Sequence, residues 1–265
     1  MIVAGCDIGS LSAKAVIMEN NKILGTGIIR AGTNPIESAT EVMKIALNDS
    51  NLAMDDIKMI VTTGYGKEMV SFANAAESEI VCHARGAFWN QPGVRTVIDI
   101  GGQDAKAIRL DENGKVIRYL YNDKCASGTG RFLEVMAEAL EVKLEDMGEI
   151  SARSKEKVVL SNQCVIFAET EVVSLVNEGK EVPDILKGLH NAMAGRVAAM
   201  AFSIGVEDDI VMTGGGAKNS GLFNALSDSL RKPLKTMNGI DPQINGALGA
   251  ALIARDVAKR SEFEG

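Results

Sequence analysis

The stretch DIGSLSAKAVIMENNKILG, residues 7–25, occurs a second time with changes as DIGGQDAKAIRLDENGKVI, residues 99–117. The two copies share Asp-Ile-Gly, Ala-Lys-Ala and a following Asn-x-Lys, and an apolar run precedes each copy. An apolar run, a polar turn with glycine and a second apolar run form the pattern of a β-hairpin. A supersecondary unit that occurs twice in this way predicts two similar lobes that face each other.

The rest of the chain predicts an α/β protein with mixed sheets. MIVTTGYG, residues 59–66, is typical of a strand and a turn, and residues 208–226 of a strand, a triple-glycine turn and a helix. INGALGAALIARDVAKR, residues 244–260, has small residues at helical spacing and predicts a closely packed helix that returns to the first lobe. The expected lobes are residues 1–95 plus 243–265, and residues 96–242. Further helices are expected over residues 36–48, 55–59, 73–88, 128–141, 166–178 and 184–205.

Composition and charge narrow the class of protein. The chain has 265 residues, 46% hydrophobic and 24% charged, as is ordinary for a soluble globular protein with a substantial core. The net charge is -7 and the basic residues are scattered, which argues against nucleic-acid binding. Neither a membrane-spanning run nor a secretory leader is evident, so we expect a cytoplasmic protein. Thiols stay reduced there, and the four cysteines are therefore candidates for packing residues, metal ligands or redox groups.

The repeated turns carry residues that suit a nucleotide triphosphate. A carboxylate at the tip of a strand can hold Mg²⁺ through water, while backbone N–H groups and hydroxyls contact phosphate oxygens. We therefore expect a triphosphate to be clamped between two opposed hairpins. The glycines at 214–216 would let backbone lie flat against the nucleoside. The candidates are Asp7, Gly9, Ser10, Ser12 and Lys14 in the first copy, Asp99, Gly101, Gly102, Gln103, Asp104 and Lys106 in the second, and Gly214, Gly215 and Gly216.

Other interpretations of these residues fit less well. A single Asp-x-Gly is most simply a hairpin turn, but two matching copies together with a triple glycine favour a nucleotide site. The chain has neither a G-x-x-x-x-G-K-[ST] motif nor a dinucleotide fingerprint after its first strand. With only His83 and His190 available, a Ser-His-Asp arrangement is not credible. His83 is expected to be a packed or partner-facing helix residue, and Cys6 and Cys82 small buried hydrophobes.

The turns at 7–14 and 99–106, with residues 211–219, resemble the phosphate and adenosine motifs of the actin, hexokinase and sugar-kinase ATPase superfamily. More specifically, the chain resembles the ATP-dependent activators of 2-hydroxyacyl-CoA dehydratases and the related ATPases of benzoyl-CoA reductases. The resemblance implies two ribonuclease H-like lobes with mixed sheets, nucleotide in the cleft between them, and Asn245 in the nucleotide site. It rests on TTGYG, CHARGA, TVIDIGGQDAK, NDKCASGTGRFLEVMA, CVIFAETEV, VMTGGGAKNSG and NGALGAAL, which span essentially the whole chain.

The same resemblance implies an oxygen-sensitive homodimer with one 4Fe-4S cluster between the two chains. Such a cluster needs four thiolates, so Cys125 and Cys164, each expected at a helix start in the second lobe, would meet their copies across a two-fold axis. ATP hydrolysis would drive one electron into an iron-sulfur partner. That partner would be a 2-hydroxyacyl-CoA dehydratase, a benzoyl-CoA reductase or a double-cubane cluster protein. Reduced ferredoxin or flavodoxin would be the electron donor.

Several alternatives remain open at this point. Leu11 stands where the resembled family often has Thr, so either Ser10 or Ser12 contacts phosphate. Either Gln103 or Asp104 orients the attacking water. The partner enzyme, its substrate, the electron donor and the cluster potential are not determined. A small-molecule kinase with Asp104 as general base is the second hypothesis, and a non-enzymatic actin-like scaffold is the third.

Overall fold

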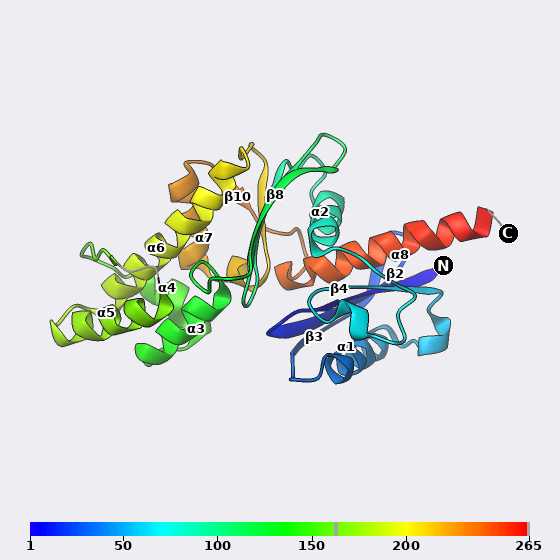
Figure 1. Ribbon diagram of the computed structural model, residues 1–265, viewed down its shortest axis with the longest axis horizontal. Coiled ribbons are helices and arrows are strands. Elements are labelled where there is room, and N and C mark those ends of the chain that lie inside the picture. Colours follow the sequence, from blue (N-terminus) through cyan, green and yellow to red (C-terminus); the bar gives the residue numbers. More distant parts are fainter. Residues whose placement is uncertain (162–163, 264–265) are drawn as a thin grey trace. The chain divides into compact units, whose positions relative to one another are not determined.

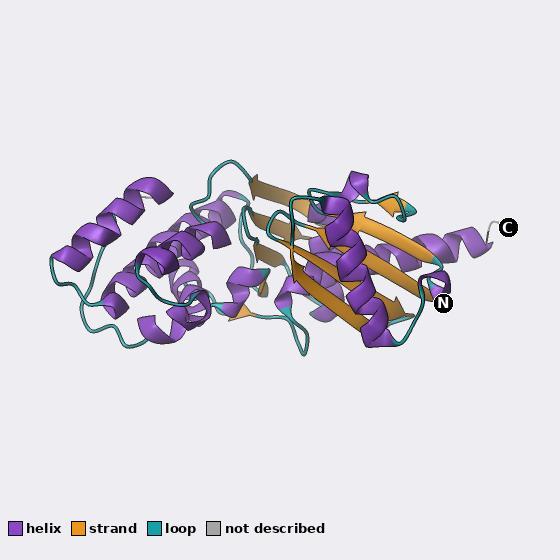
Figure 2. Ribbon diagram, turned by 90° about the horizontal axis from the view of Figure 1, so that it is seen from below, coloured by secondary structure: helices purple, strands orange, loops and turns teal. Residues whose placement is uncertain are grey.

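The computed structural model describes residues 1–161 and 164–263, and the chain divides into two compact units. Each unit contains one five-stranded sheet and its own helices (Figures 1 and 2). The two-lobe α/β fold with mixed sheets is therefore confirmed. Unit 1 consists of Met1–Val94, Leu110–Val116 and Met237–Gly265, and unit 2 of Arg95–Arg109 and Ile117–Thr236.

The sheet of unit 1 has the strand order β3-β2-β1-β4-β5. Helix α1 packs on β2 and β3, whereas α8 packs on β1 and β4 and also contacts α2 (Figure 1). The strands are β1 (Ile2–Ile8), β2 (Ser12–Glu19), β3 (Lys22–Arg30), β4 (Met59–Thr63) and β5 (Ala75–Ala76). The helices are α1 (Pro35–Ser50), α2 (Glu79–Asn90) and α8 (Asn245–Phe263).

Helix α1 shows how the local sequence sets the ends of an element. The Asn34 side chain accepts hydrogen bonds from the N–H groups of Ile36 and Glu37, and Pro35 occupies the first turn, where no intrahelical donor is needed. At the other end Asn51 adopts a left-handed conformation, which a short polar side chain tolerates. The expected helix over 36–48 is thus confirmed.

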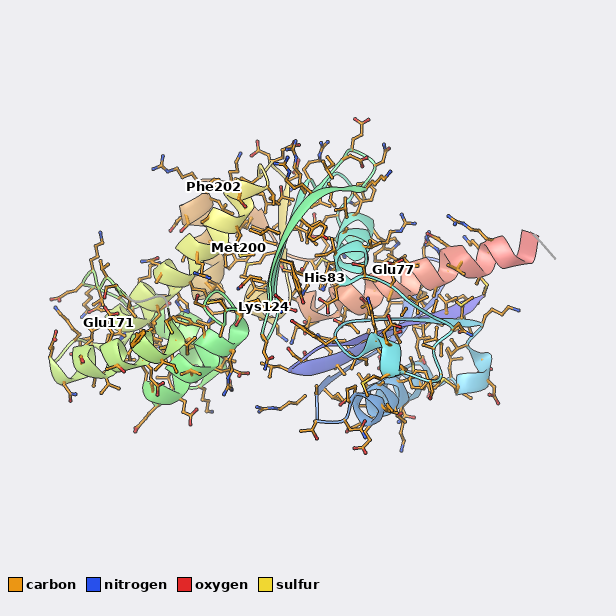
Figure 3. All side chains as sticks on the ribbon, viewed as in Figure 1. Glu77, His83, Lys124, Glu171, Met200 and Phe202 are labelled. Atoms are coloured by element: carbon orange, nitrogen blue, oxygen red, sulfur yellow. The ribbon has the colours of Figure 1, made fainter. Side chains whose placement is uncertain are left out.

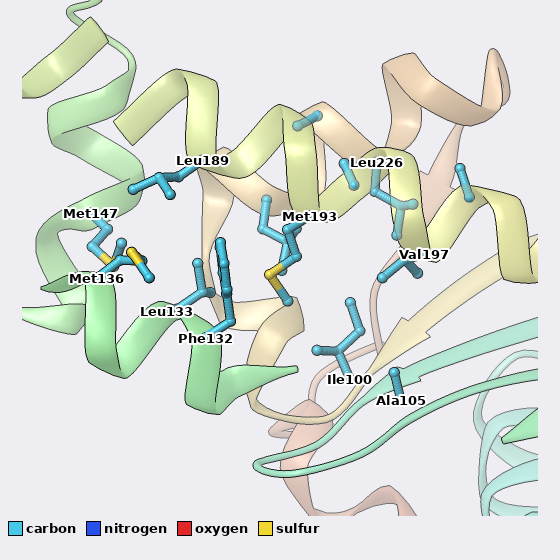
Figure 4. Close-up of a cluster of buried hydrophobic side chains, with 14 of the residues drawn as sticks. Ile100, Ala105, Phe132, Leu133, Met136, Met147, Leu189, Met193, Val197 and Leu226 are labelled. Carbon is cyan, nitrogen blue, oxygen red and sulfur yellow. The ribbon is translucent and has the colours of Figure 1, made fainter. Parts of the chain in front are cut away.

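The sheet of unit 2 has the order β10-β9-β6-β7-β8. Its core lies between this sheet and the helices, with Phe132, Leu133, Met136 and Met193 among the buried side chains (Figure 4). The strands are β6 (Thr96–Ile100), β7 (Ala105–Leu110), β8 (Val116–Asn122), β9 (Ile210–Thr213) and β10 (Leu234–Lys235). The helices are α3 (Gly130–Ala139), α4 (Met147–Ser151), α5 (Val165–Asn177), α6 (Val182–Ser203) and α7 (Ser220–Leu230).

The sequence repeat is a structural repeat. Strands β1 and β2 pair antiparallel with Asp7 opposite Lys14, and β6 and β7 pair antiparallel with Asp99 opposite Lys106. The repeat extends to a third strand that the sequence comparison missed. Strand β4 runs parallel to β1, with Thr63 level with the first aspartate, and β9 runs parallel to β6, with Thr213 level with the second.

Two expectations about the elements were wrong. The helix expected over 73–88 begins only at Glu79, because Ala75–Ala76 form the short strand β5 beside β4 and the Glu77 N–H bonds to the Thr62 carbonyl. The helix expected over 55–59 is a single 3-10 turn at Met54–Asp56. None of the described helices is long and apolar enough to cross a membrane.

Helices α2 and α8 of unit 1 approach closely because α8 has a glycine at the contact. A Cβ atom added at Gly249 would collide with the backbone carbonyl of Cys82 on α2. The small residues of α8 therefore have the packing role that their spacing predicted, and a side chain at this point would push the helices apart.

We predict that Gly249→Ala lowers the free energy of unfolding by about 1–3 kcal/mol or more, because backbone atoms must move to admit the methyl group. Gly195→Ala on α6 is the matched control, since an added Cβ there meets no atom within 4 Å. That control should leave stability unchanged or raise it by about 0.5–1 kcal/mol, the ordinary gain of Ala over Gly in a helix. Urea denaturation of both variants measures the difference, and equal midpoints would contradict the packing argument.

Candidate functional site

The first repeated turn, in unit 1, centres on the buried carboxylate of Asp7 at the end of β1. Lys14 Nζ lies 3.2 Å from Asp7 Oδ2 and also donates to the Ser12 carbonyl at 3.3 Å. The turn is closed by a hydrogen bond of 3.1 Å from the Gly9 N–H to the same carbonyl. The turn therefore presents backbone groups around a carboxylate whose charge is balanced by a lysine.

The second turn, in unit 2, repeats this construction and adds a second carboxylate. Lys106 Nζ lies 3.4 Å from Asp99 Oδ2 and 3.0 Å from Asp104 Oδ1, and all three side chains are buried. The hydroxyl of Tyr121 on β8 donates to Asp104 Oδ2 at 3.3 Å. The Gly101 N–H bonds to the Asp104 carbonyl at 3.0 Å, as Gly9 does to Ser12 in the first copy.

The triple glycine lies directly beside Asp99. Thr213 Oγ1 donates to Asp99 Oδ1 at 2.7 Å, and Gly214 has a φ of 79°, a conformation that favours glycine. A Cβ at Gly214 would collide with the Ile100 carbonyl, and one at Gly216 would stand 2.7 Å from Ile100 Cβ. This turn therefore brings bare backbone to the second carboxylate, whereas Gly215 is exposed.

The turn at 101–104 distinguishes the two candidates for positioning water. The Gln103 side chain is exposed at the tip of the turn. Asp104, by contrast, is buried, and its two carboxylate oxygens face Lys106 and Tyr121. Of the two side chains, that of Asp104 is engaged in an ion pair, whereas that of Gln103 is exposed.

The second turn is hydrogen-bonded to the start of α3. The Gly130 N–H donates to the Gly101 carbonyl at 2.8 Å, and the Arg131 N–H donates to the Gly102 carbonyl at 2.7 Å. These are first-turn N–H groups, which have no partner within their own helix. The loop that immediately precedes α3, residues 123–129, contains Cys125, so one glycine turn is tied directly to the end of the cysteine loop.

The four cysteines fall into two classes. Cys6 and Cys82 are buried, and burial raises the pKa of Cys82 to about 12 and that of Cys6 further. Cys125 is partly exposed and Cys164 is exposed. Cys164 stands at the N-cap of α5, as predicted, but the expectation of Cys125 at a helix start was wrong, because α3 begins only at Gly130.

The cysteine loop holds Cys125 by short-range hydrogen bonds. Its carbonyl accepts from Asn122 Nδ2 at 2.8 Å, and its Sγ lies 3.2 Å from the hydroxyl of the buried Ser127. This hydroxyl is the main cause that lowers the pKa of the Cys125 thiol, and the charge of Arg196 acts in the same direction. A thiol with these neighbours is suited to act as a thiolate ligand.

Helix α5, which follows Cys164, exposes apolar side chains. Ile166 is 71% exposed and Phe167 is 63% exposed, and Val173 and Val176 are also exposed. An exposed apolar patch of this kind marks an interaction surface. This apolar patch directly follows the exposed Cys164 in the sequence.

Within the described residues, the side chains do not form a complete metal site. No group of three or more His, Cys, Asp or Glu side chains is arranged there to hold an ion. Two accessible thiols per chain are half of the set that a 4Fe-4S cluster requires, so they fit that group only if a second chain supplies the others. A single carboxylate beside phosphate oxygens suffices for Mg²⁺, which keeps several of its waters.

Some residues around these turns were missed from the sequence. Thr213 and Tyr121 contact the aspartates of unit 2, and neither belongs to the repeated motif. Asn245, expected to contact nucleotide, is fully buried, and its Nδ2 donates to His83. Thr213 directly precedes the triple glycine in the sequence, and this position could have indicated that it lies beside Asp99.

Comparisons with known proteins cover the whole chain. The family model of the BadF/BadG/BcrA/BcrD ATPases matches residues 4–254. The chain is 43% identical to the 2-hydroxyisocaproyl-CoA dehydratase activator of Clostridioides difficile over 100% of this chain and 98% of that one. It is 35% identical to one of the polypeptides of the benzoyl-CoA reductase of Thauera aromatica over 95% of this chain and 92% of that polypeptide.

Solved structures agree with these sequence matches. The C. difficile activator with bound ADPNP superposes with a TM-score of 0.95 at 43% identity, over 100% of this chain and 98% of that one. A ROK family glucokinase from Streptomyces griseus matches with a TM-score of 0.61 at 13% identity, over 97% of this chain and 100% of that one. The second likeness shows a shared fold alone.

We predict that Ser127→Ala raises the pKa of the Cys125 thiol, because the hydroxyl that favours the thiolate is lost. In a Cys164→Ser background, the rate of alkylation by iodoacetamide reports the Cys125 thiolate. Its pH midpoint should lie below the ordinary value of 9.0 and move upward in the variant. Ser161→Ala is the control, because Ser161 bonds to Glu171. An unchanged midpoint in Ser127→Ala would contradict the assignment.

Proposed function

The chain belongs to the BadF/BadG/BcrA/BcrD ATPase family, and on this basis we propose that it is an ATP-dependent reductive activator of an iron-sulfur partner enzyme. It would hydrolyse ATP and pass one electron at low potential to that partner. The observation that carries the proposal is full-length similarity to a dehydratase activator, combined with two repeated carboxylate turns and two accessible cysteines in one chain. A 2-hydroxyacyl-CoA dehydratase is the favoured partner, and a benzoyl-CoA reductase or a double-cubane cluster protein is the alternative.

Nucleotide binding is assigned to the two turns and the triple glycine. Asp7 and Asp99 would hold Mg²⁺ through water, because each stands at a strand end with a lysine to balance its charge. Backbone N–H groups of the turns, with Lys14 and Lys106, would contact phosphate oxygens. Gly214, Gly215 and Gly216 would contact the adenosine, and Ser10 or Ser12 a phosphate.

For hydrolysis we assign the orientation of the attacking water to Gln103. Its side chain is exposed at the tip of the second turn, while Asp104 is engaged by Lys106 and Tyr121. A glutamine in this role orients water by hydrogen bonds and has no need to change its protonation state. Asp104 instead keeps Lys106 in place.

The small-molecule kinase hypothesis is not favoured. Its general base would be Asp104, and that carboxylate is buried and faces a lysine and a tyrosine. A general base must reach the proton of an acceptor hydroxyl, which a carboxylate held in this way does not. The similarity to a sugar kinase is a similarity of fold, whereas the similarity to the activators extends to the sequence.

Cys125 and Cys164 would ligate one 4Fe-4S cluster together with the same two residues of a second chain. The bound cluster would supply a one-electron carrier at low potential. The exposed apolar face of α5 supports the homodimer, because burying Ile166 and Phe167 against a second copy removes apolar surface from water next to Cys164. Reduced ferredoxin or flavodoxin would be the electron donor, and the protein would be oxygen-sensitive and cytoplasmic.

The hydrogen bonds between the second turn and α3 support a link between nucleotide and electron transfer. A change at Gly101 and Gly102 when phosphate is lost would act on the first N–H groups of α3 and thereby on the Cys125 loop. Two nucleotide states with different contacts to this turn can in this way favour two positions of the loop.

The proposal predicts that anaerobically prepared protein is a brown dimer with about two irons per chain, since four irons are shared by two chains. With ATP and a low-potential reductant it should activate a 2-hydroxyacyl-CoA dehydratase. Cys125→Ser and Cys164→Ser should each lose the colour and the activation, while Cys6→Ala and Cys82→Ala keep both. Visible absorption, iron analysis and light scattering report the outcome. Full colour in Cys125→Ser would refute the ligand assignment, and phosphorylation of a small hydroxyl compound would favour the kinase.

A second prediction concerns the ATPase reaction. Gln103→Ala should lower kcat for ATP hydrolysis by about 10²–10³-fold with little change in ATP affinity, because it removes one preorganised contact to the reacting water. Asp104→Asn should instead lower stability, because Lys106 then loses one of its two buried carboxylate neighbours. Steady-state phosphate release and thermal unfolding of both variants measure these effects. An unchanged kcat in Gln103→Ala with a loss in Asp104→Asn would reverse the assignment.

A further inference from the structure

The segment that leads to Cys164, residues 154–161, is attached to unit 2 along its length, and we call it the strap. Near its start, two successive backbone N–H groups of the strap donate to one carboxylate oxygen of the buried Asp184 on α6, at 2.6 and 2.9 Å. Val158 and Leu160 then place buried side chains in the core of unit 2. Contacts with α6 and with the core thus hold most of the strap.

A glutamate on α5 holds the end of the strap that is nearest to Cys164. Glu171 is half-buried in the second turn of α5 (Figure 3), and its Oε1 accepts two hydrogen bonds from Ser161. The Ser161 N–H donates at 2.8 Å and the Ser161 hydroxyl at 2.9 Å. Hydrogen bonds to a carboxylate are among the stronger ones in proteins, and two donors from one residue also fix its direction.

On its other side, Cys164 is bound to α5 through its own carbonyl. This carbonyl accepts a hydrogen bond of 2.8 Å from the Ala168 N–H, as expected of a residue at an N-cap. Cys164 therefore stands between two attachments to the same helix. The chain between Ser161 and Cys164 is short, so a fixed Ser161 limits the positions that Cys164 can take.

The two accessible cysteines are held in different ways. The Cys125 thiol lies beside the Ser127 hydroxyl, and its carbonyl accepts from Asn122. The Cys164 side chain is exposed, and its Sγ makes no hydrogen bond within the part of the chain that the structure describes. The position of Cys164 is therefore set through its backbone, to which the bonds between Ser161 and Glu171 contribute on the N-terminal side.

We propose that Glu171 is a positioning residue for Cys164, and that it acts through its hydrogen bonds to Ser161 and not through its charge. It keeps the Cys164 backbone where the thiolate can join the other ligands of a cluster. A ligand that is held in place before iron binds loses less conformational freedom on binding. The inference rests on the proposed role of Cys164 as a cluster ligand.

Two substitutions separate the reach of the Glu171 side chain from its charge. Glu171→Gln keeps an acceptor oxygen at the same reach and removes the charge, whereas Glu171→Asp keeps the charge and is one methylene shorter. We expect a chelator to remove iron about 10–100-fold faster from Glu171→Asp and Glu171→Ala, and at close to the wild-type rate from Glu171→Gln. Glu169→Ala removes an exposed charge from the same turn of α5 and should not change the rate.

A second readout needs no iron. Cys6 and Cys82 are buried, so in a Cys125→Ser background a nitroxide label attaches at Cys164, and its EPR spectrum reports local mobility. Mobility should rise on Glu171→Ala and Glu171→Asp, and stay unchanged on Glu171→Gln and Glu169→Ala. Thermal unfolding midpoints of these iron-free proteins should be similar, because polar contacts near the surface contribute little to stability.

Wild-type iron loss and unchanged label mobility in Glu171→Ala would overturn the inference and leave the proposed function intact. Fast iron loss from Glu171→Gln with wild-type behaviour in Glu171→Asp would also overturn it, because charge would then be the property that matters. Wild-type protein that assembles no cluster under anaerobic conditions would refute the proposed ligand role of Cys164, and this inference with it.

Discussion

The pairing of a buried aspartate with a lysine opposite it in a hairpin is the interaction on which both candidate nucleotide turns depend. In each unit the two residues are register partners, so the same backbone geometry places a cation beside the carboxylate. A buried carboxylate without a counter-charge would be strongly destabilising. The lysine balances the charge of the carboxylate at the end of the strand, and the neighbouring glycines let backbone groups approach it.

The second copy of the repeated turn makes more contacts with surrounding residues than the first copy does. Its lysine serves two carboxylates, lies 5.2 Å from the centre of the Tyr121 ring, and is buried. Its turn also accepts hydrogen bonds from the start of α3. The second copy thus has the connections that a coupling element needs, whereas the Asn245 contacts in unit 1 join α8 to α2. The two copies of a duplicated segment can therefore have different roles in one protein.

The cysteines show how burial divides one residue type by function. Cys6 lies within a central strand and Cys82 against α8, where neither thiol can ionise readily. Cys125 and Cys164 lie in a loop and at a helix N-cap, where their thiols are accessible from outside the chain. The sequence alone left all four as candidates for packing, and the family resemblance singled out two of them. Their exposure supplies an independent physical reason for that choice.

The repeated hairpins, the glycine turn after β9 and the family could be predicted from the sequence, because they depend on short-range patterns of apolar residues, glycine and carboxylates. The side chains that complete each turn became evident only in the folded chain. Thr213 and Tyr121 reach the aspartates of unit 2 from other segments of the chain, and no local pattern encodes a contact across that separation. The start of α2 was mispredicted for the same reason, since residues 75–76 follow the pairing offered by β4 over their local helical preference.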